Sequence, residues 1–176
     1  MEKCQRGIFM YKGEITIKET TERDLENVMN LWNNGEVMFF VGFPDGLGIT
    51  LDQLKGWLKG AIKKPERCHY SIYAEGIGYC GETFYDVDVK HDLASMDIKL
   101  LPHAQGKGIA AKALSFAIDK AFTEGKVNQV YVEPQSANRK AWALYEKLGF
   151  VSKERPTYLE EDDTYLELTK YEWYKI

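Results

Sequence analysis

The segment that most restricts the fold of this chain is KLLPHAQGKGIAAKAL, Lys99 to Leu114. Two glycines and a lysine stand directly before a helical pattern of apolar residues, and the alternating segment 95–101 before them is typical of a strand. A helix N-terminus carries unpaired N–H groups, and glycine lets a ligand approach the backbone closely. The sequence therefore predicts a strand, a phosphate-binding loop and a helix in succession.

Two common phosphate-binding loops fit this segment poorly. The P-loop requires Ser or Thr after its Gly-Lys pair, whereas Gly108 follows Lys107 here. The dinucleotide pattern G-x-G-x-x-G/A is satisfied by 106–111, but residues 102–105 separate it from the strand, and Asp97 interrupts the apolar run. Only one βαβ unit follows, where that fold needs several. An NAD-dependent oxidoreductase is therefore the less favoured alternative.

A third pattern fits both the loop and its surroundings. Gln105, Gly108 and Ala110 match Q/R-x-x-G-x-G/A, and NRKAWALYEKLGF at 138–150 matches N-x-x-A/S-x-x-x-Y-x-K-x-G-F. In these two motifs the segment 95–150 resembles the GCN5-related N-acetyltransferases (GNAT superfamily), which use acetyl-CoA. A looser similarity links LWNNGEVMFFVGFPDG, 31–46, to the branch of ribosomal-protein N-terminal and aminoglycoside 6′-N-acetyltransferases.

The apolar patterns predict one domain over 1–176 with strands and helices in mixed order. Two short strands around Lys12-Gly13 are followed by two helices, three strands, a helix, a strand, a helix and two strands. The expected strands after the first pair are 69–75, 79–88, 95–101, 127–133, 150–158 and 164–173, and the first two helices begin at Thr21 and Thr50. The resemblance implies an α+β GNAT fold: a mixed, mostly antiparallel sheet of six to seven strands with a central splayed parallel pair, flanked by about four helices.

The resemblance also implies where acetyl-CoA, the co-substrate, binds. Its diphosphate is expected on the N–H groups of the glycine loop, and its pantetheine arm between the strands 95–101 and 127–133. Asn138 is expected to bond the arm, with a plain helix N-cap as the alternative, and Arg139 or Lys140 to reach the 3′-phosphate. The predicted cofactor-binding residues are Ile98, Lys99, Leu100, Leu101, Gln105, Gly106, Lys107, Gly108, Ile109, Ala110, Asn138 and Lys140.

Acetyl transfer to an amine needs an acid for the departing thiolate and a base for the ammonium proton. Tyr145 occupies the position of the family's tyrosine, the usual proposed acid; alternatively it only packs on the inward face of its helix. Asp97 and Glu133 are the candidate bases, each with a structural role as its alternative. No covalent enzyme intermediate and no metal are expected.

The acceptor is expected to lie against the first helices, the loop between them and the last hairpin, as in the resembling family. The predicted substrate-binding residues are Phe40, Phe43, Asp45 and Tyr158, although aromatics here suit a core as well. A protein N-terminus, an aminoglycoside and a polyamine all stay open, and the branch similarity favours an N-terminal or small amine. The non-enzymatic alternative is an acyl-CoA-binding module on the same scaffold.

Charge and composition exclude several other classes of protein. The net charge of −4 argues against nucleic-acid binding, and no apolar run approaches the ~20 residues that cross a membrane. The start of the sequence has no apolar segment typical of a secretory signal. Three cysteines without metal-type spacing favour reduced thiols in the cytoplasm. A homodimer is possible, and the acidic segment 159–167 is expected to form a solvated turn or to attract a cationic acceptor.

Overall fold

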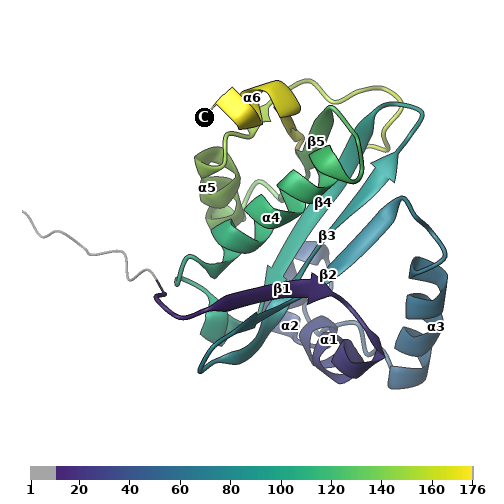
Figure 1. The fold of residues 1–176 in the computed structure, drawn as a ribbon, viewed down its shortest axis with the longest axis vertical. Coiled ribbons are helices and arrows are strands. Elements are labelled where there is room, and N and C mark those ends of the chain that lie inside the picture. Colours follow the sequence, from purple (N-terminus) through teal and green to yellow (C-terminus); the bar gives the residue numbers. More distant parts are fainter. Residues whose placement is uncertain (1–10, 176) are drawn as a thin grey trace, which may run out of the picture.

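Seven strands form one continuous sheet in the computed structural model, which describes residues 11–175 (Figure 1). All neighbouring strands are antiparallel except the central pair β4 and β5, in the order β1-β2-β3-β4-β5-β7-β6. This confirms the predicted α+β class and its parallel pair. The strand predicted just before Lys12 lies almost wholly outside the described residues. The strands are β1 (Ile15–Glu19), β2 (Arg67–Ala74), β3 (Gly78–Asp88), β4 (Leu93–Leu100), β5 (Gln129–Val132), β6 (Val151–Ser152) and β7 (Leu166–Thr169).

The helices pack on both faces of this sheet (Figure 1). One face carries the N-terminal helices, whose buried side chains form a core with Tyr79 of β3. The other face packs against α4 and α5 in a larger core that includes Met96 of β4 and Leu168 of β7. The helices are α1 (Leu25–Trp32), α2 (Gly35–Met38), α3 (Leu51–Ala61), α4 (Ile109–Thr123), α5 (Arg139–Lys147) and α6 (Lys170–Lys175), with 3₁₀ turns at Glu22–Asp24, Phe39–Val41 and Pro102–Ala104.

The predicted capping residues cap the 3₁₀ turn Glu22–Asp24 that leads into α1 and the first turn of α3. At the entry to α1, the backbone N–H of Thr21 donates to the Asp24 carboxylate at 2.8 Å, and at the entry to α3 the N–H of Thr50 donates to Gln53 at the same distance. Each cap satisfies backbone donors that a helix cannot pair internally. The two capping boxes fix where α1 and α3 start, and therefore where the loop between them lies.

The parallel pair separates part-way along its length. β4 and β5 are paired only at Leu93–Gln129, Ala94–Val130 and Ser95–Tyr131. Beyond Ser95, β4 continues to Leu100, whereas β5 ends at Val132. The segment 96–100 therefore has no strand partner on its β5 side, and a gap opens in the middle of the sheet.

The prediction of two long C-terminal strands is wrong. β6 comprises only Val151 and Ser152, because the chain soon reaches Pro156, which has no N–H to donate to a sheet. β7 ends at Thr169, where α6 begins. The Thr169 hydroxyl donates to Glu172 at 2.8 Å and accepts from the Glu172 N–H at 3.1 Å, which caps the helix. This T-x-x-E pattern was present in the sequence, but the aromatic residues after it favoured a strand.

No helix among residues 11–175 has the length and apolar composition needed to cross a membrane.

Candidate active site

The glycine loop before α4 has the backbone conformation of an anion-binding site. Gly106 and Gly108 both lie in the left-handed region, with φ of 73° and 78°, and no atom lies within 4 Å of the place where their Cβ would be. Gly108 is the N-cap of α4 and supplies no side chain to its first N–H groups. The helix start is therefore open, and its N–H groups can donate hydrogen bonds to a phosphate.

The two predicted motifs meet at this loop. Gln105 donates from Nε2 to the Leu100 carbonyl at 3.1 Å, which ties the loop to the end of β4. Its Oε1 accepts from Lys140 Nζ at 3.4 Å, so the start of α5 lies beside the loop. The Lys107 carbonyl accepts from the N–H of Tyr11 at 3.0 Å and is fixed on that side. Lys140 is thereby placed close to the predicted diphosphate position.

The unpaired part of β4 and the glycine loop leave backbone groups without strand or helix partners, which a ligand with a diphosphate and an amide-bearing arm needs. Of the predicted arm contacts, 98–100 lie on the part of β4 that β5 leaves unpaired, and Leu101 follows directly after it. Asn138 caps α5 by accepting from the Ala141 N–H at 3.2 Å. The N-cap alternative is therefore confirmed for its oxygen, while the role of Asn138 toward the arm stays a prediction.

Tyr145 lies inside the core beneath the gap. Its side chain is 5% exposed and packs against Phe150, with ring centroids 5.6 Å apart. Burial raises the pKa of the Tyr145 hydroxyl, and the negative charge of Asp97 raises it further. Tyr145 therefore keeps its proton at neutral pH, and the Asp97 carboxylate lies within electrostatic reach of it.

The two predicted bases have different surroundings. Asp97 follows the last β4–β5 pair, is one-third exposed, and forms an ion pair with Lys99. Its Oδ1 also accepts from the Ile98 N–H at 2.7 Å. Glu133 forms an ion pair with Arg155, whose guanidinium also donates to carbonyls of the loop 153–165. Glu133 thus anchors a loop, whereas Asp97 lies at the edge of the gap.

A buried carboxylate, Glu82 of β3, was missed by the sequence reasoning. Its side chain is 2% exposed; Oε1 accepts from Trp32 Nε1 at 2.7 Å, and Oε2 lies 2.9 Å from His69 Nε2 at an angle outside that of a hydrogen bond. Lys99 Nζ lies 3.7 Å from Oε1. Burial alone would raise the pKa of Glu82, but His69, Lys99 and Trp32 lower it overall. The signal available in the sequence was Glu82 itself, a carboxylate within the predicted strand 79–88.

The predicted acceptor residues lie in two separate places. Phe40, Phe43 and Asp45 belong to the loop between α1 and α3, which Asn33 closes by pairing with both backbone groups of Ile49. Phe43 is 45% exposed and Phe40 is half-buried. Tyr158 instead stacks on His91 of the β3–β4 turn, with ring centroids 3.7 Å apart and planes within 4°.

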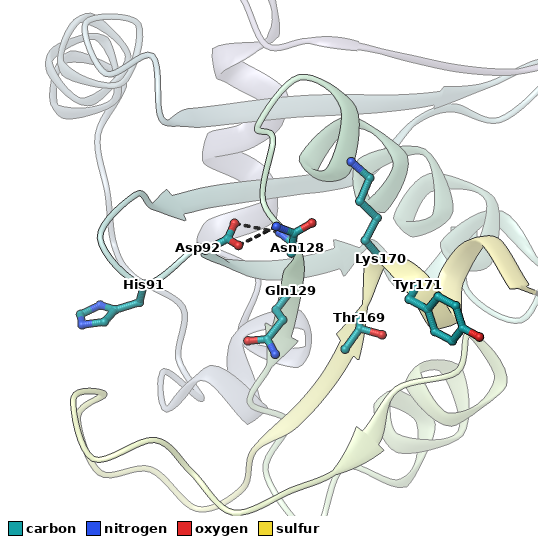
Figure 2. A pocket seen from close by; sticks show the side chains of 7 residues that line it. All are labelled: His91, Asp92, Asn128, Gln129, Thr169, Lys170 and Tyr171. Atoms are coloured by element: carbon teal, nitrogen blue, oxygen red, sulfur yellow. Dashed lines mark hydrogen bonds between the residues drawn. The ribbon is translucent and has the colours of Figure 1, made fainter.

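A surface hollow of about 370 Å³ lies elsewhere, at the N-terminal end of β4 (Figure 2). Asn128 donates there to the Asp92 carboxylate from its N–H and from its side chain, at 2.9 and 2.7 Å. The hollow adjoins the paired end of β4 and β5, whereas the glycine loop follows the opposite end of β4. Among the described residues, no group of three or more His, Cys, Asp or Glu side chains is arranged to hold a metal ion.

The comparisons with known proteins agree with this geometry. Residues 14–151 match the family model of the acetyltransferase (GNAT) domain. Spermidine N(1)-acetyltransferase of Vibrio cholerae is 34% identical over 142 residues, 80% of this chain and 81% of the relative. The Escherichia coli K12 enzyme of the same name is 28% identical over 137 residues, 77% and 72% of the two chains. The crystal structure of the V. cholerae spermidine N-acetyltransferase with CoA and spermine has a TM-score of 0.78 at 21% identity, covering 91% of this chain and 98% of that one.

A match of this extent places the chain in the acetyltransferase (GNAT) family. It is an N-acetyltransferase that moves an acetyl group from acetyl-CoA to an amine. This confirms the resemblance found in 95–150 and the expected fold, and it contradicts the oxidoreductase alternative. The relatives reported above are spermidine acetyltransferases, so the ribosomal and aminoglycoside branch stays a prediction only.

Proposed function

We propose that this chain acetylates a primary amine of a small polyamine such as spermidine. The names of the V. cholerae and E. coli relatives support this acceptor class. The observation that carries the proposal is the position of Asp97 and Tyr145 on opposite faces of the sheet, on either side of the β4–β5 gap. A carboxylate on one face can bind a cationic amine, and a protonated hydroxyl on the other can act as the general acid.

The proposed mechanism divides the proton transfers between these two side chains. Bound acetyl-CoA supplies the thioester carbonyl that an amine attacks. Asp97, directly or through water, takes a proton from the ammonium, which is mostly protonated at neutral pH. Tyr145, whose hydroxyl stays protonated because it is buried, would donate that proton to the sulfur of the departing CoA thiolate. The N–H groups of 105–110 and Lys140 hold the phosphates, and 98–101 lie along the arm.

The acceptor is tested by thiol release from acetyl-CoA against a panel of amines. Spermidine and spermine are compared with an aminoglycoside and a peptide with a free N-terminus. We expect kcat/KM for spermidine to exceed that for the peptide by at least tenfold. A peptide preferred over the polyamines would support the ribosomal branch instead and overturn this acceptor.

The acid role is tested by Tyr145→Phe, which keeps the packing against Phe150 and removes the hydroxyl. General acid catalysis contributes typically 10²–10⁴-fold, so kcat should fall by about 10²-fold or more. Acetyl-CoA binding, measured by calorimetry, should stay within about threefold of wild type. Equal kcat for the two proteins would show that Tyr145 only packs. Thiol release that no amine accelerates in wild type would favour the acyl-CoA-binding module.

The expected self-association, single domain over 1–176 and cytoplasmic location stay predictions. A V. cholerae spermidine N-acetyltransferase is described as dodecameric, and its fold matches this one with a TM-score of 0.73 at 21% identity over 90% of this chain. We infer that this chain also assembles with its own copies. Light scattering at micromolar concentration tests this assembly, and a monomer would contradict it.

A further inference from the structure

Four charged or titratable side chains meet on the sheet face that α1 and α3 cover: His69 of β2, Glu82 of β3, and Asp97 and Lys99 of β4. We call them the Lys99 cluster. Lys99 Nζ pairs with the Asp97 carboxylate on one side and lies 3.7 Å from Glu82 on the other. Glu82 in turn is held by Trp32 and faces His69. The cluster therefore joins the buried interior to the partly exposed Asp97.

Burial makes this arrangement costly unless its charges balance. The Lys99 side chain is 11% exposed, so burial lowers its pKa, but Asp97 and Glu82 raise the pKa above its ordinary value overall. Lys99 is thus a permanent cation between two carboxylates. Of the two carboxylates beside this ammonium, only Asp97 reaches solvent, because the Glu82 side chain is 2% exposed.

The backbone around the cluster is closely packed. A Cβ at Gly81 would lie 2.0 Å from the Lys99 carbonyl oxygen, so only glycine lets β3 approach β4 this closely. The pairing of β2 with β3 also shifts register between Ile72 and Tyr73, opposite this point. Such irregularities are common beside active sites, where they redirect a side chain. Glu82 directly follows Gly81, so the irregularity lies next to the buried carboxylate of the Lys99 cluster.

We propose that Lys99 is a positioning residue that acts through Asp97. Glu82, fixed by Trp32, holds the Lys99 ammonium, and the ammonium holds the Asp97 carboxylate at the edge of the gap. On the other side of Asp97 the Ile98 N–H donates to Oδ1, so both carboxylate oxygens have a partner. This inference rests on the role that the proposed function gives to Asp97. It assigns the side chain of Lys99 a function separate from the backbone contact expected for residue 99.

A double-mutant cycle in kcat tests the inference, with Lys99→Met, Asp97→Asn and the combined variant. We expect Asp97→Asn to lower kcat about 10²-fold and Lys99→Met roughly tenfold. Because Lys99 acts through Asp97, adding Lys99→Met to Asp97→Asn should cost less than about twofold more. Lys99→Arg should recover most of the lost kcat, and Lys59→Met, on the exposed side of α3, is the matched control and should leave kcat unchanged.

Independent losses would overturn the inference. If the fold-losses in kcat of Lys99→Met and Asp97→Asn multiply in the combined variant, Lys99 does not act through Asp97. A wild-type kcat for Lys99→Met would overturn it as well. Should Lys99→Met not melt cooperatively, Glu82→Gln replaces it in the cycle with the same expected non-additivity, since it keeps the Trp32 bond and removes the charge. The cycle is measured with whichever amine the wild type acetylates fastest. If spermidine is not acetylated, the acceptor proposal is overturned, but the cycle still tests the role of Lys99.

Discussion

At the scale of single residues, the candidate site combines a buried hydroxyl, Tyr145, with a partly exposed carboxylate, Asp97. Tyr145 and Asp97 differ in exposure and lie on opposite faces of the sheet, so each has a separate environment. Burial raises the pKa of the Tyr145 hydroxyl, as suits a group that must keep its proton until it acts as an acid. The α5 motif indicated Tyr145, and the position of Asp97 on the strand before the glycine loop made it a candidate base. Glu82, which lies 3.7 Å from the Lys99 ammonium that pairs with Asp97, was found only in the structure.

Because Glu82 is buried and ionised, we expect the stability of the folded protein to decrease in acid. Its pKa is lower in the folded protein than the ordinary ~4.3 of the unfolded chain, so ionised Glu82 stabilises the folded state above that pH. As the pH falls through the folded pKa, the proton binds and this stability is lost. We expect the free energy of unfolding, measured with urea, to decrease from pH 5 to pH 3. The decrease should be smaller in Glu82→Gln, and an equal decrease in both proteins would contradict the prediction.

At the scale of elements, the loop before α4 shows why two glycines occur there. Gly108 has a positive φ in open space, so Gly108→Ala introduces backbone strain without a steric clash. We expect a loss of about 1 kcal/mol in the free energy of unfolding. Acetyl-CoA affinity should fall as well, because a Cβ would stand beside the open N–H groups.

Gly60 in α3 is the matched control for this substitution. It also has open space around its Cβ position, but without a positive φ. Gly60→Ala should therefore stabilise the protein by about 0.5–1 kcal/mol and leave acetyl-CoA affinity unchanged. Chemical denaturation and calorimetry measure both quantities. A stabilising effect of Gly108→Ala would mean that the loop does not need the left-handed conformation.

The last element, α6, depends on its cap. Thr169 satisfies the Glu172 N–H, and α6 is further held by Trp173, whose Nε1 donates to Asp119 of α4 at 2.7 Å. Thr169→Ala removes the cap and should lower the free energy of unfolding by about 1 kcal/mol. Thr157→Ala, at an exposed loop position, should have an effect near zero. Equal effects of the two substitutions in urea denaturation would contradict the capping role.

At the scale of the whole molecule, the sequence predicted elements better than their ends and contacts. The glycine loop and the α5 motif each have a fixed spacing, so 95–150 could be interpreted correctly from local pattern. The contact of Glu82 with His69 could not, because a hairpin pattern does not fix the register that brings these two side chains together. The C-terminal strands failed because aromatic content indicated strand, while a single cap and Pro156 decided otherwise.

The placement of acetyl-CoA predicts which amides become protected when it binds. In hydrogen exchange, saturating acetyl-CoA should slow exchange most in 96–110 and at the start of α5, which line the β4–β5 gap and the glycine loop. The hollow in Figure 2, at the paired end of β4, is the rival location. Its Asp92 and Asn128 already bond each other, which argues against a ligand there. We expect unchanged exchange at 91–92 and 169–171. Binding at ~100 times Kd contributes about 2.7 kcal/mol, so the midpoint of thermal unfolding should also rise by roughly 5–10 °C. Protection confined to the hollow would move the site and remove Asp97 and Tyr145 from the reaction.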